Sequence, residues 1–227
     1  MIKKIGLALA VLVVLVLGFA ATRPATFRIE RSATFAAPPA VAFALVNDFS
    51  KWAGWSPWEK LDASMKKTLS GPPAGVGAKY EWTGNDKVGQ GEMTILESKA
   101  PEHIGIDLRF LKPWAAVNPT TFDFKPAGEG VAVTWAMTGK NDFMGKLFGL
   151  FMDIEKMVGG DFERGLAAMK TLAEAEGARL EAQAVAKAAA EAAAKAAADA
   201  AAAKAAAEAL AAEAAAKAMK GGKTKKK

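Results

Sequence analysis

Residues 48–60 read "DFSKWAGWSPWEK" and place Trp52, Trp55 and Trp58 within seven positions. They are half of the six tryptophans in the chain, and a tryptophan buries roughly 150–250 Å² when it enters a core. A glycine and a proline separate them, so the stretch predicts a short helix followed by a loop. Trp52 and Trp55, three residues apart, would share a face of that helix. We expect at least two of the three indoles to pack in the core and at most one to contact a ligand.

The segments on both sides of this stretch alternate apolar and polar residues, as strands do. Residues 26–35, "TFRIERSATF", form the first such run, and Pro38 and Pro39 then favour a short helix through about Asn47. Further strand-like runs, separated by turn residues, occupy 65–71, 78–84, 89–100, 103–111, 120–127 and 131–139. The short connections predict six or seven strands in an antiparallel sheet.

The pattern changes to a helical period after residue 140. An apolar stripe is predicted along 141–158, formed by Phe143, Leu147, Leu150, Phe151, Ile154 and Val158. Gly159 and Gly160 predict an interruption, and Asp161 is a candidate N-cap for a second helical segment. That segment presents Phe162, Leu166, Met169 and Leu172 on one stripe. The order of elements predicts an α+β fold, with helices on one side of the sheet.

Three motifs carry a resemblance to a known family: "WAGWSPW" at 52–58, "GPPAGVGAKYEWTG" at 71–84 and "GGDFERGLAAMKTLAE" at 159–174. Together with the element order, residues 25–177 resemble the START/Bet v1-like (SRPBCC) superfamily, specifically its polyketide cyclase/dehydrase and lipid-transport branch. The resemblance implies a helix-grip fold, in which a curved antiparallel sheet wraps around a long C-terminal helix. It also implies an apolar cavity between the sheet and that helix.

Aromatic and methionine side chains suit such a cavity, because residues two apart on a strand point to one side of the sheet and Met adapts to irregular shapes. The alternative is that the same side chains simply fill a core. As ligand-binding residues we predict Trp55, Tyr80, Trp82, Met93, Phe110, Trp135, Met137, Phe148, Met152 and Phe162.

The chain offers few groups for catalysis. It has no Cys and one His, which excludes disulfides, thiolate metal sites and cysteine nucleophiles. His103 is predicted to be an exposed turn residue before a strand. The acids of the strands, Glu81, Glu92, Asp107 and Asp123, are predicted to face outward. We therefore expect no catalytic residues, metal or cofactor, and a binding function is favoured over an enzymatic one.

The N-terminus begins "MIKK" and continues with 17 uncharged residues, 5–21. This length is at the lower limit for a membrane-spanning helix and overlaps that of signal-peptide cores. We favour an uncleaved anchor that includes Ile5, Leu9, Val13 and Leu17, with a cleaved signal peptide as the alternative. The two lysines favour a cytoplasmic N-terminus. The rest of the chain is then non-cytoplasmic, and periplasmic if the organism is bacterial; with a cleaved signal peptide it is periplasmic or secreted.

The C-terminal region has a composition of its own. Between Ala182 and Ala218, 26 of 37 residues are Ala, and opposite charges recur at a spacing of four, which predicts an exposed single helix. A close-packed pair of such helices is the alternative, and the few large apolar residues do not favour a Leu-based coiled coil. The final residues are cationic, and we expect Lys223, Lys225, Lys226 and Lys227 to contact an anionic envelope surface, with nucleic acid least favoured.

The predicted domains are an anchor or signal peptide at 1–22, a helix-grip domain at 23–177, a helical extension at 178–219 and a Lys-rich tip at 220–227. The first functional hypothesis is a membrane-anchored domain that binds a lipid or another hydrophobic small molecule. The alternatives are an enzyme of cyclase, dehydrase or hydrolase type in the same fold, and a structural or interaction protein of the cell envelope that acts through its tail.

Overall fold

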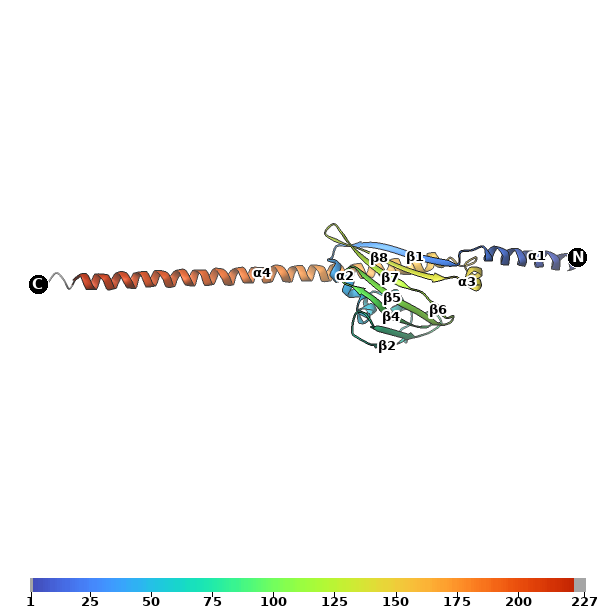
Figure 1. Ribbon diagram of the computed structural model, residues 1–227, viewed down its shortest axis with the longest axis horizontal. Helices are drawn as coiled ribbons and strands as arrows, with labels where there is room; N and C mark the ends of the chain where they lie inside the picture. The colour runs from blue at the N-terminus through green and yellow to red at the C-terminus, as the bar shows by residue number, and fades with distance from the viewer. Residues whose placement is uncertain (1, 223–227) are drawn as a thin grey trace. The chain divides into compact units, whose positions relative to one another are not determined.

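A computed structural model describes residues 2–222 (Figure 1). The chain divides into two units, Met1–Ala178 and Arg179–Lys227, and each is treated by itself. The helices are α1 (Ile2–Ala21), α2 (Pro39–Val46), α3 (Phe143–Phe148) and α4 (Ile154–Gly222), with two 3₁₀ helices, η1 (Phe49–Gly54) and η2 (Pro57–Lys60). The strands are β1 (Thr26–Phe35), β2 (Lys66–Ser70), β3 (Lys79–Thr83), β4 (Gln90–Lys99), β5 (His103–Lys112), β6 (Ala116–Val117), β7 (Thr120–Ala127) and β8 (Gly130–Lys140).

The strands form one antiparallel sheet in the order β1-β8-β7-β5-β4-β3-β2, and the short β6 pairs with β5. A register shift between Ile95 and Glu97 of β4 marks a bulge, a feature that bends a strand. The sheet curves around α2 and the first part of α4 (Figure 1). The predicted α+β class and helix-grip fold are thus confirmed. The sequence missed only β6, which is two residues long.

Two indoles of the tryptophan stretch cap the C-terminal end of α2. Trp52 Nε1 donates to the Val46 carbonyl and Trp55 Nε1 donates to the Leu45 carbonyl, each over 3.0 Å. The last carbonyls of a helix have no partner within the helix, so these bonds satisfy two of them. Both indoles are buried, with their ring centroids 4.6 Å apart. Pro57 begins η2, a second short helix, where we had predicted a loop.

The part of α4 that covers the sheet presents a stripe of Phe162, Leu166, Met169 and Ala173, all buried. Phe162 lies almost parallel to the ring of Trp135 on β8, with centroids 4.1 Å apart and an interplanar angle of 8°. One helical turn away, Gly165 faces the same indole: a Cβ atom there would lie 2.8 Å from Trp135 Cζ3. The glycine therefore lets α4 approach the indole closely. Ala173 takes the place that we had predicted for Leu172, which is partly exposed.

The predicted interruption at Gly159 and Gly160 is wrong, because α4 runs through both residues. A Cβ at Gly159 would collide with the guanidinium of Arg31. Arg31, on β1, donates to Glu163 over 2.6 Å and to Glu155 over 2.8 Å, so it ties two turns of α4 to the sheet edge. Asp161 lies inside the helix and pairs with Arg164, so it is not an N-cap.

The apolar stripe predicted along 141–158 is only partly right, because Ile154 and Val158 pack against the core but the segment is not one continuous helix. Residues 143–148 form α3, a turn follows, and α4 begins only at Ile154. Asp142 caps α3 by accepting a hydrogen bond from the Gly145 backbone amide over 2.7 Å. Phe143 and Phe151 are exposed rather than buried.

Helix α1 is, among the described residues, the one helix long and apolar enough to cross a membrane. Length and composition are weak evidence of a span, because a signal sequence has the same properties. The predicted anchor residues Ile5, Leu9, Val13 and Leu17 all lie on α1 and are exposed.

In the C-terminal unit the Ala-rich segment is helical to Gly222, and three pairs of opposite charge lie close together at the predicted spacing of four. The side chains of Lys187 and Glu191, of Lys204 and Glu208, and of Lys217 and Glu213 lie within 4.0 Å of each other. The lysines predicted to contact an anionic surface, Lys223, Lys225, Lys226 and Lys227, lie outside the described residues.

Two glycine substitutions test the close approach of α4 to the sheet. Gly165→Ala should lower the free energy of unfolding by about 1–2 kcal/mol, because the clash with Trp135 outweighs the gain in helix propensity. The matched control is Gly160→Ala, whose Cβ would meet only Arg164 Nη1 at 3.6 Å and should raise stability by up to about 1 kcal/mol. Denaturant unfolding followed by tryptophan fluorescence measures both. Equal effects of the two substitutions would contradict the packing.

Candidate ligand-binding cavity

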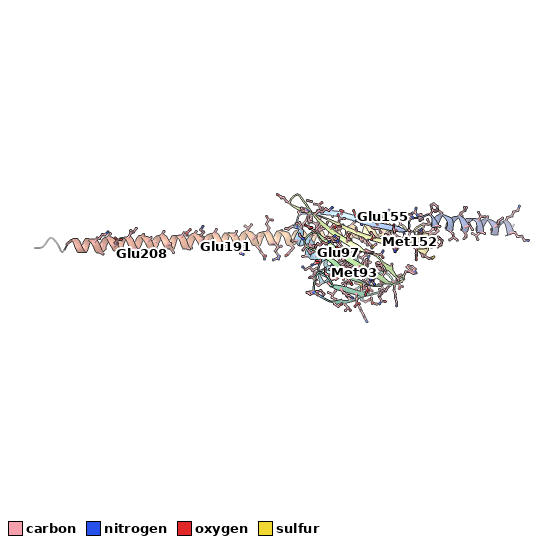
Figure 2. All side chains as sticks on the ribbon, in the orientation of Figure 1. Met93, Glu97, Met152, Glu155, Glu191 and Glu208 are labelled. Atoms are coloured by element: carbon pink, nitrogen blue, oxygen red, sulfur yellow. The ribbon has the colours of Figure 1, made fainter. Side chains whose placement is uncertain are left out.

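A cavity of about 190 Å³ lies between the sheet, the two 3₁₀ helices and α4. Strands β3, β4, β5 and β8 supply seven of the seventeen lining residues, and α4 contributes Val158 and Phe162. Figure 2 marks Met93, one of the wall residues, in the middle of the sheet. The lining residues are Trp52, Ser56, Trp58, Glu59, Met65, Tyr80, Trp82, Lys87, Val88, Met93, Leu108, Phe110, Thr120, Trp135, Met137, Val158 and Phe162.

The cavity brings together seven of the ten residues predicted to bind a ligand. These seven are Tyr80, Trp82, Met93, Phe110, Trp135, Met137 and Phe162. Trp55 is buried in the core instead, where its ring meets Trp135 edge to face at 5.5 Å. Phe148 and Met152 are exposed and lie outside the cavity wall. Contact of the seven with a ligand remains a prediction.

Two of the three clustered tryptophans, Trp52 and Trp58, line the cavity, and the expectation that at most one of the three contacts a ligand stays a prediction. The ring of Trp58 stands edge to face against Trp135 at 5.7 Å and against Phe162 at 6.3 Å. Such edge-to-face pairs are favoured geometries for aromatic rings. The indole of Trp58 is therefore held at the cavity wall by packing on both of these rings.

A glycine makes room for another wall residue. Gly91 on β4 pairs directly with Trp82 on β3, and a Cβ at this position would collide with the Trp82 ring. Trp82 Nε1 donates to the Val88 carbonyl over 2.9 Å, and its ring meets Phe110 edge to face at 5.9 Å. The hairpin of β3 and β4 thus holds the Trp82 indole over Gly91 of β4.

Glu59 is the polar feature of the cavity that the sequence did not reveal. Its side chain is only 7% exposed and pairs with Lys67, and one of its oxygens accepts a hydrogen bond from the Tyr80 hydroxyl over 2.6 Å. A buried carboxylate needs such partners, because an unpaired buried charge is strongly destabilising. Glu59 directly follows Trp58 in the sequence, so its position near the aromatic cluster was visible. The local sequence pattern does not show that its side chain points inward.

Burial raises the pKa of Tyr80 well above its usual value, and the hydrogen bond to the Glu59 carboxylate raises it further. The neutral phenol is thereby retained, because its proton is shared with a carboxylate in a poorly hydrated site. Tyr80 therefore presents a hydroxyl, not a phenolate, at the cavity wall.

Trp135, a wall residue, has a buried donor without a partner. Among the buried side-chain atoms of the described residues, Trp135 Nε1 makes no hydrogen bond, although Trp135 is only 2% exposed. An unsatisfied buried donor costs about 1–3 kcal/mol. Trp52, Trp55 and Trp82 all find carbonyl acceptors for their indoles. The free indole N–H distinguishes Trp135 from these three.

Lys87 also lines the cavity, whereas His103 and the acids of the strands lie away from its wall. His103 is the first residue of β5, not an exposed turn residue as predicted: its Nδ1 is 2.7 Å from Asp123 on β7. The strand acids Glu81, Glu92 and Asp107 do not line the cavity.

Asp62 is buried but accepts hydrogen bonds from Ser64 and from the Asn85 amide, which lower its pKa and give it a structural role. No group of three or more potential metal ligands occurs within the described part of the chain.

Comparison with known proteins identifies a family for most of this unit. The family described as polyketide cyclase / dehydrase and lipid transport matches residues 26–174, more than half of the chain. No curated protein matches the chain significantly.

Solved structures share the architecture at low sequence identity. The di-domain ARO/CYC StfQ of the steffimycin biosynthetic pathway is 11% identical, with 66% of this chain and 51% of that chain covered and a TM-score of 0.52. Protein CV1439 from Chromobacterium violaceum is 20% identical over 67% of this chain and 99% of that chain, with a TM-score of 0.48. A protein from Thermobifida fusca is 22% identical over 63% and 90%, with a TM-score of 0.49. At these identities the likeness to StfQ supports the fold alone.

The environment of Tyr80 predicts its titration, and Tyr80 is the sole tyrosine of the chain. In the folded protein the ultraviolet absorbance of phenolate should stay absent through about pH 10, where the denatured chain titrates. Because the folded pKa is raised, the contribution of Tyr80 to stability is complete below about pH 10 and is lost as the pH rises further. The decline in unfolding free energy above that pH should be smaller in Tyr80→Phe. A phenolate signal near pH 10 from chain that is still folded would contradict this environment.

Proposed function

The chain belongs to the polyketide cyclase / dehydrase and lipid transport family, and from that membership we propose that its first unit binds a compact hydrophobic molecule in the cavity between the sheet and α4. The observation that carries the proposal is the cavity itself: about 190 Å³ of space whose wall is mostly aromatic and aliphatic. Binding sites for small molecules are typically apolar hollows with a few polar groups that orient the ligand. Glu59, Tyr80 and Trp135 would be those groups here.

The size of the cavity limits the ligand. An apolar cavity of about 150 Å³ holds one benzene ring, so a cavity of about 190 Å³ suits two fused rings or a short length of alkyl chain. Each 100 Å² of apolar ligand surface removed from water contributes roughly 2.5 kcal/mol. The flat indoles of Trp58, Trp82 and Trp135 favour a ring system over a chain, because offset stacking and edge-to-face contacts add to the burial term.

The polar groups indicate where a ligand would carry its heteroatom. Trp135 Nε1 is a donor without a partner, so a ligand oxygen that accepts its hydrogen bond would remove the cost of the unsatisfied N–H. The Tyr80 hydroxyl already donates to Glu59, which leaves its oxygen as an acceptor. We propose a largely apolar ligand with a carbonyl, ether or hydroxyl oxygen.

We further propose that α1 anchors this unit in a membrane. A helix of 20 residues is about 30 Å long, which matches the hydrocarbon thickness of a bilayer. Its apolar side chains are exposed along its length. Lys3 and Lys4 favour a cytoplasmic N-terminus by the positive-inside rule, and on that basis we propose that the binding unit lies on the non-cytoplasmic side.

Catalysis in the same cavity is the second candidate, and the Glu59–Tyr80 pair favours it. A carboxylate hydrogen-bonded to a phenol in an apolar site is an arrangement that can move a proton to or from a bound ring compound. If the unit is an enzyme, Glu59→Gln and Tyr80→Phe would abolish conversion of the bound compound, as followed by mass spectrometry. If it only binds, wild-type protein would leave the compound unchanged.

A cavity-filling variant tests binding. Leu108 lines the cavity, and Leu108→Trp should fill it; Leu69, half exposed on the edge strand β2, provides the control Leu69→Trp. The full chain, purified in mild detergent and extracted with organic solvent, should yield a hydrophobic compound close to one per protein from wild type and Leu69→Trp, and far less from Leu108→Trp. Equal recovery from all three, or none from wild type, would contradict binding in this cavity.

A pair of probes tests the role of the indole N–H. Tetralin and 1-tetralone are fused-ring molecules of similar shape that differ by one carbonyl. In Trp135→Phe the dissociation constant of 1-tetralone should rise roughly three- to tenfold more than that of tetralin. A difference of this size corresponds to the loss of one neutral hydrogen bond. The same loss for both probes would mean that the N–H does not face the ligand.

A further inference from the structure

Six large apolar side chains remain exposed at one end of the sheet. We call them the α3 surface: Trp114, Phe143, Met144, Phe148, Phe151 and Met152. Phe151 is 75% exposed and Trp114 is 72% exposed. Scattered exposed apolar residues are normal in proteins, but a contiguous group marks a contact with a membrane or another molecule.

The fold holds these residues together. Trp114, in the β5–β6 connection, lies with its ring 5.8 Å from that of Phe148 on α3. Asp142 caps the start of α3, and Asp153 accepts a hydrogen bond from the Lys156 amide at the start of α4 over 3.0 Å. The apolar side chains therefore project from capped helical turns and a short hairpin. Figure 1 places β6, α3 and the start of β1 at the same end of the sheet, and Figure 2 marks Met152 there.

The chain itself ties this surface to the end of α1. Helix α1 ends at Ala21 and β1 begins at Thr26, which pairs with Lys140 just before α3. The Asn141 amide donates to the Ala25 carbonyl over 2.9 Å. Lys146 on α3 reaches the Ala21 carbonyl at 3.4 Å. The four linking residues span at most about 14 Å even when fully extended.

We propose that the α3 surface docks into the bilayer leaflet from which α1 emerges, so that the first unit lies against the membrane rather than free above it. This rests on the proposed anchoring by α1. A surface held so near the end of a spanning helix lies at the depth of the headgroups, where tryptophan is enriched in membrane proteins. Exposed phenylalanine and methionine side chains gain by leaving water at that depth.

The charges beside the α3 surface fit an anionic leaflet. Arg23, Lys112, Lys140, Lys146 and Lys156 lie within the same segments. Of the acids in these segments, Asp142 and Asp153 cap backbone amides and Glu155 pairs with Arg31. Juxtamembrane basic residues are attracted to anionic lipid headgroups. Apolar side chains with basic residues in the same segments fit a membrane surface that carries anionic headgroups.

Site-directed spin labelling tests the docking on the full chain, which has no native cysteine. Labels at Phe151→Cys and Trp114→Cys are compared with a label at Glu129→Cys, an exposed residue in the β7–β8 turn. The turn is separated from the α3 end by the length of β8, about 30 Å. The protein is reconstituted in vesicles of equal parts phosphatidylcholine and phosphatidylglycerol, and collision with oxygen, which dissolves in lipid, is compared with collision with a water-soluble nickel complex.

The proposal predicts that labels at 151 and 114 collide severalfold more with oxygen than with the nickel complex, and that the label at 129 shows the reverse. Protein that floats with vesicles but shows all three labels in water overturns the docking and leaves anchoring and ligand binding intact. Protein that does not float with vesicles overturns both the anchor and the docking. Ligand recovery from the cavity-filling variants is a separate readout, so its failure is distinguishable from either result.

Discussion

The stacked rings of Trp135 and Phe162 are the contact on which the rest of the first unit depends. They join β8, which lies next to the edge strand β1, to α4, and Gly165 is the residue that allows the helix to come close enough. Trp55 and Trp58 both stand edge to face against Trp135, so the 3₁₀ helices are positioned by the same indole. Trp135 also forms part of the cavity wall.

Much of the fold was predictable because strands and tryptophans leave local signals. The alternation in 26–35 predicted β1 without error, and the six runs that followed closely matched six of the other seven strands. The glycines of α4 were misread because a sequence does not distinguish a glycine that breaks a helix from one that permits close packing. Gly159 and Gly165 belong to the second kind, since Arg31 and Trp135 occupy the space of their missing side chains. Those neighbours are more than 25 residues away in the chain, beyond the reach of any local pattern.

The cavity was predictable in part for the same reason. Residues on strands, such as Tyr80, Trp82 and Trp135, followed from the period of two and lie in the wall. Residues outside the strands did not follow: Glu59 and Trp58 enter the wall from a 3₁₀ helix, while Phe148 and Met152 are exposed. An apolar stripe indicates that a segment avoids water, but not whether it does so in a core or at a membrane. The first unit thus combines an inward apolar surface, suited to a small molecule, with an outward one beside α1.

The central claim is that a small hydrophobic molecule occupies the cavity beside Trp135. The most direct measurement is a crystal structure of the full chain purified in mild detergent, without added ligand. The account predicts non-protein electron density within the cavity of about 190 Å³, in contact with the Tyr80 and Trp135 side chains and with an oxygen at hydrogen-bond distance from Trp135 Nε1. A cavity closed by inward movement of Trp58, Phe110 and Met137, with no density and no space for a ligand, would contradict it.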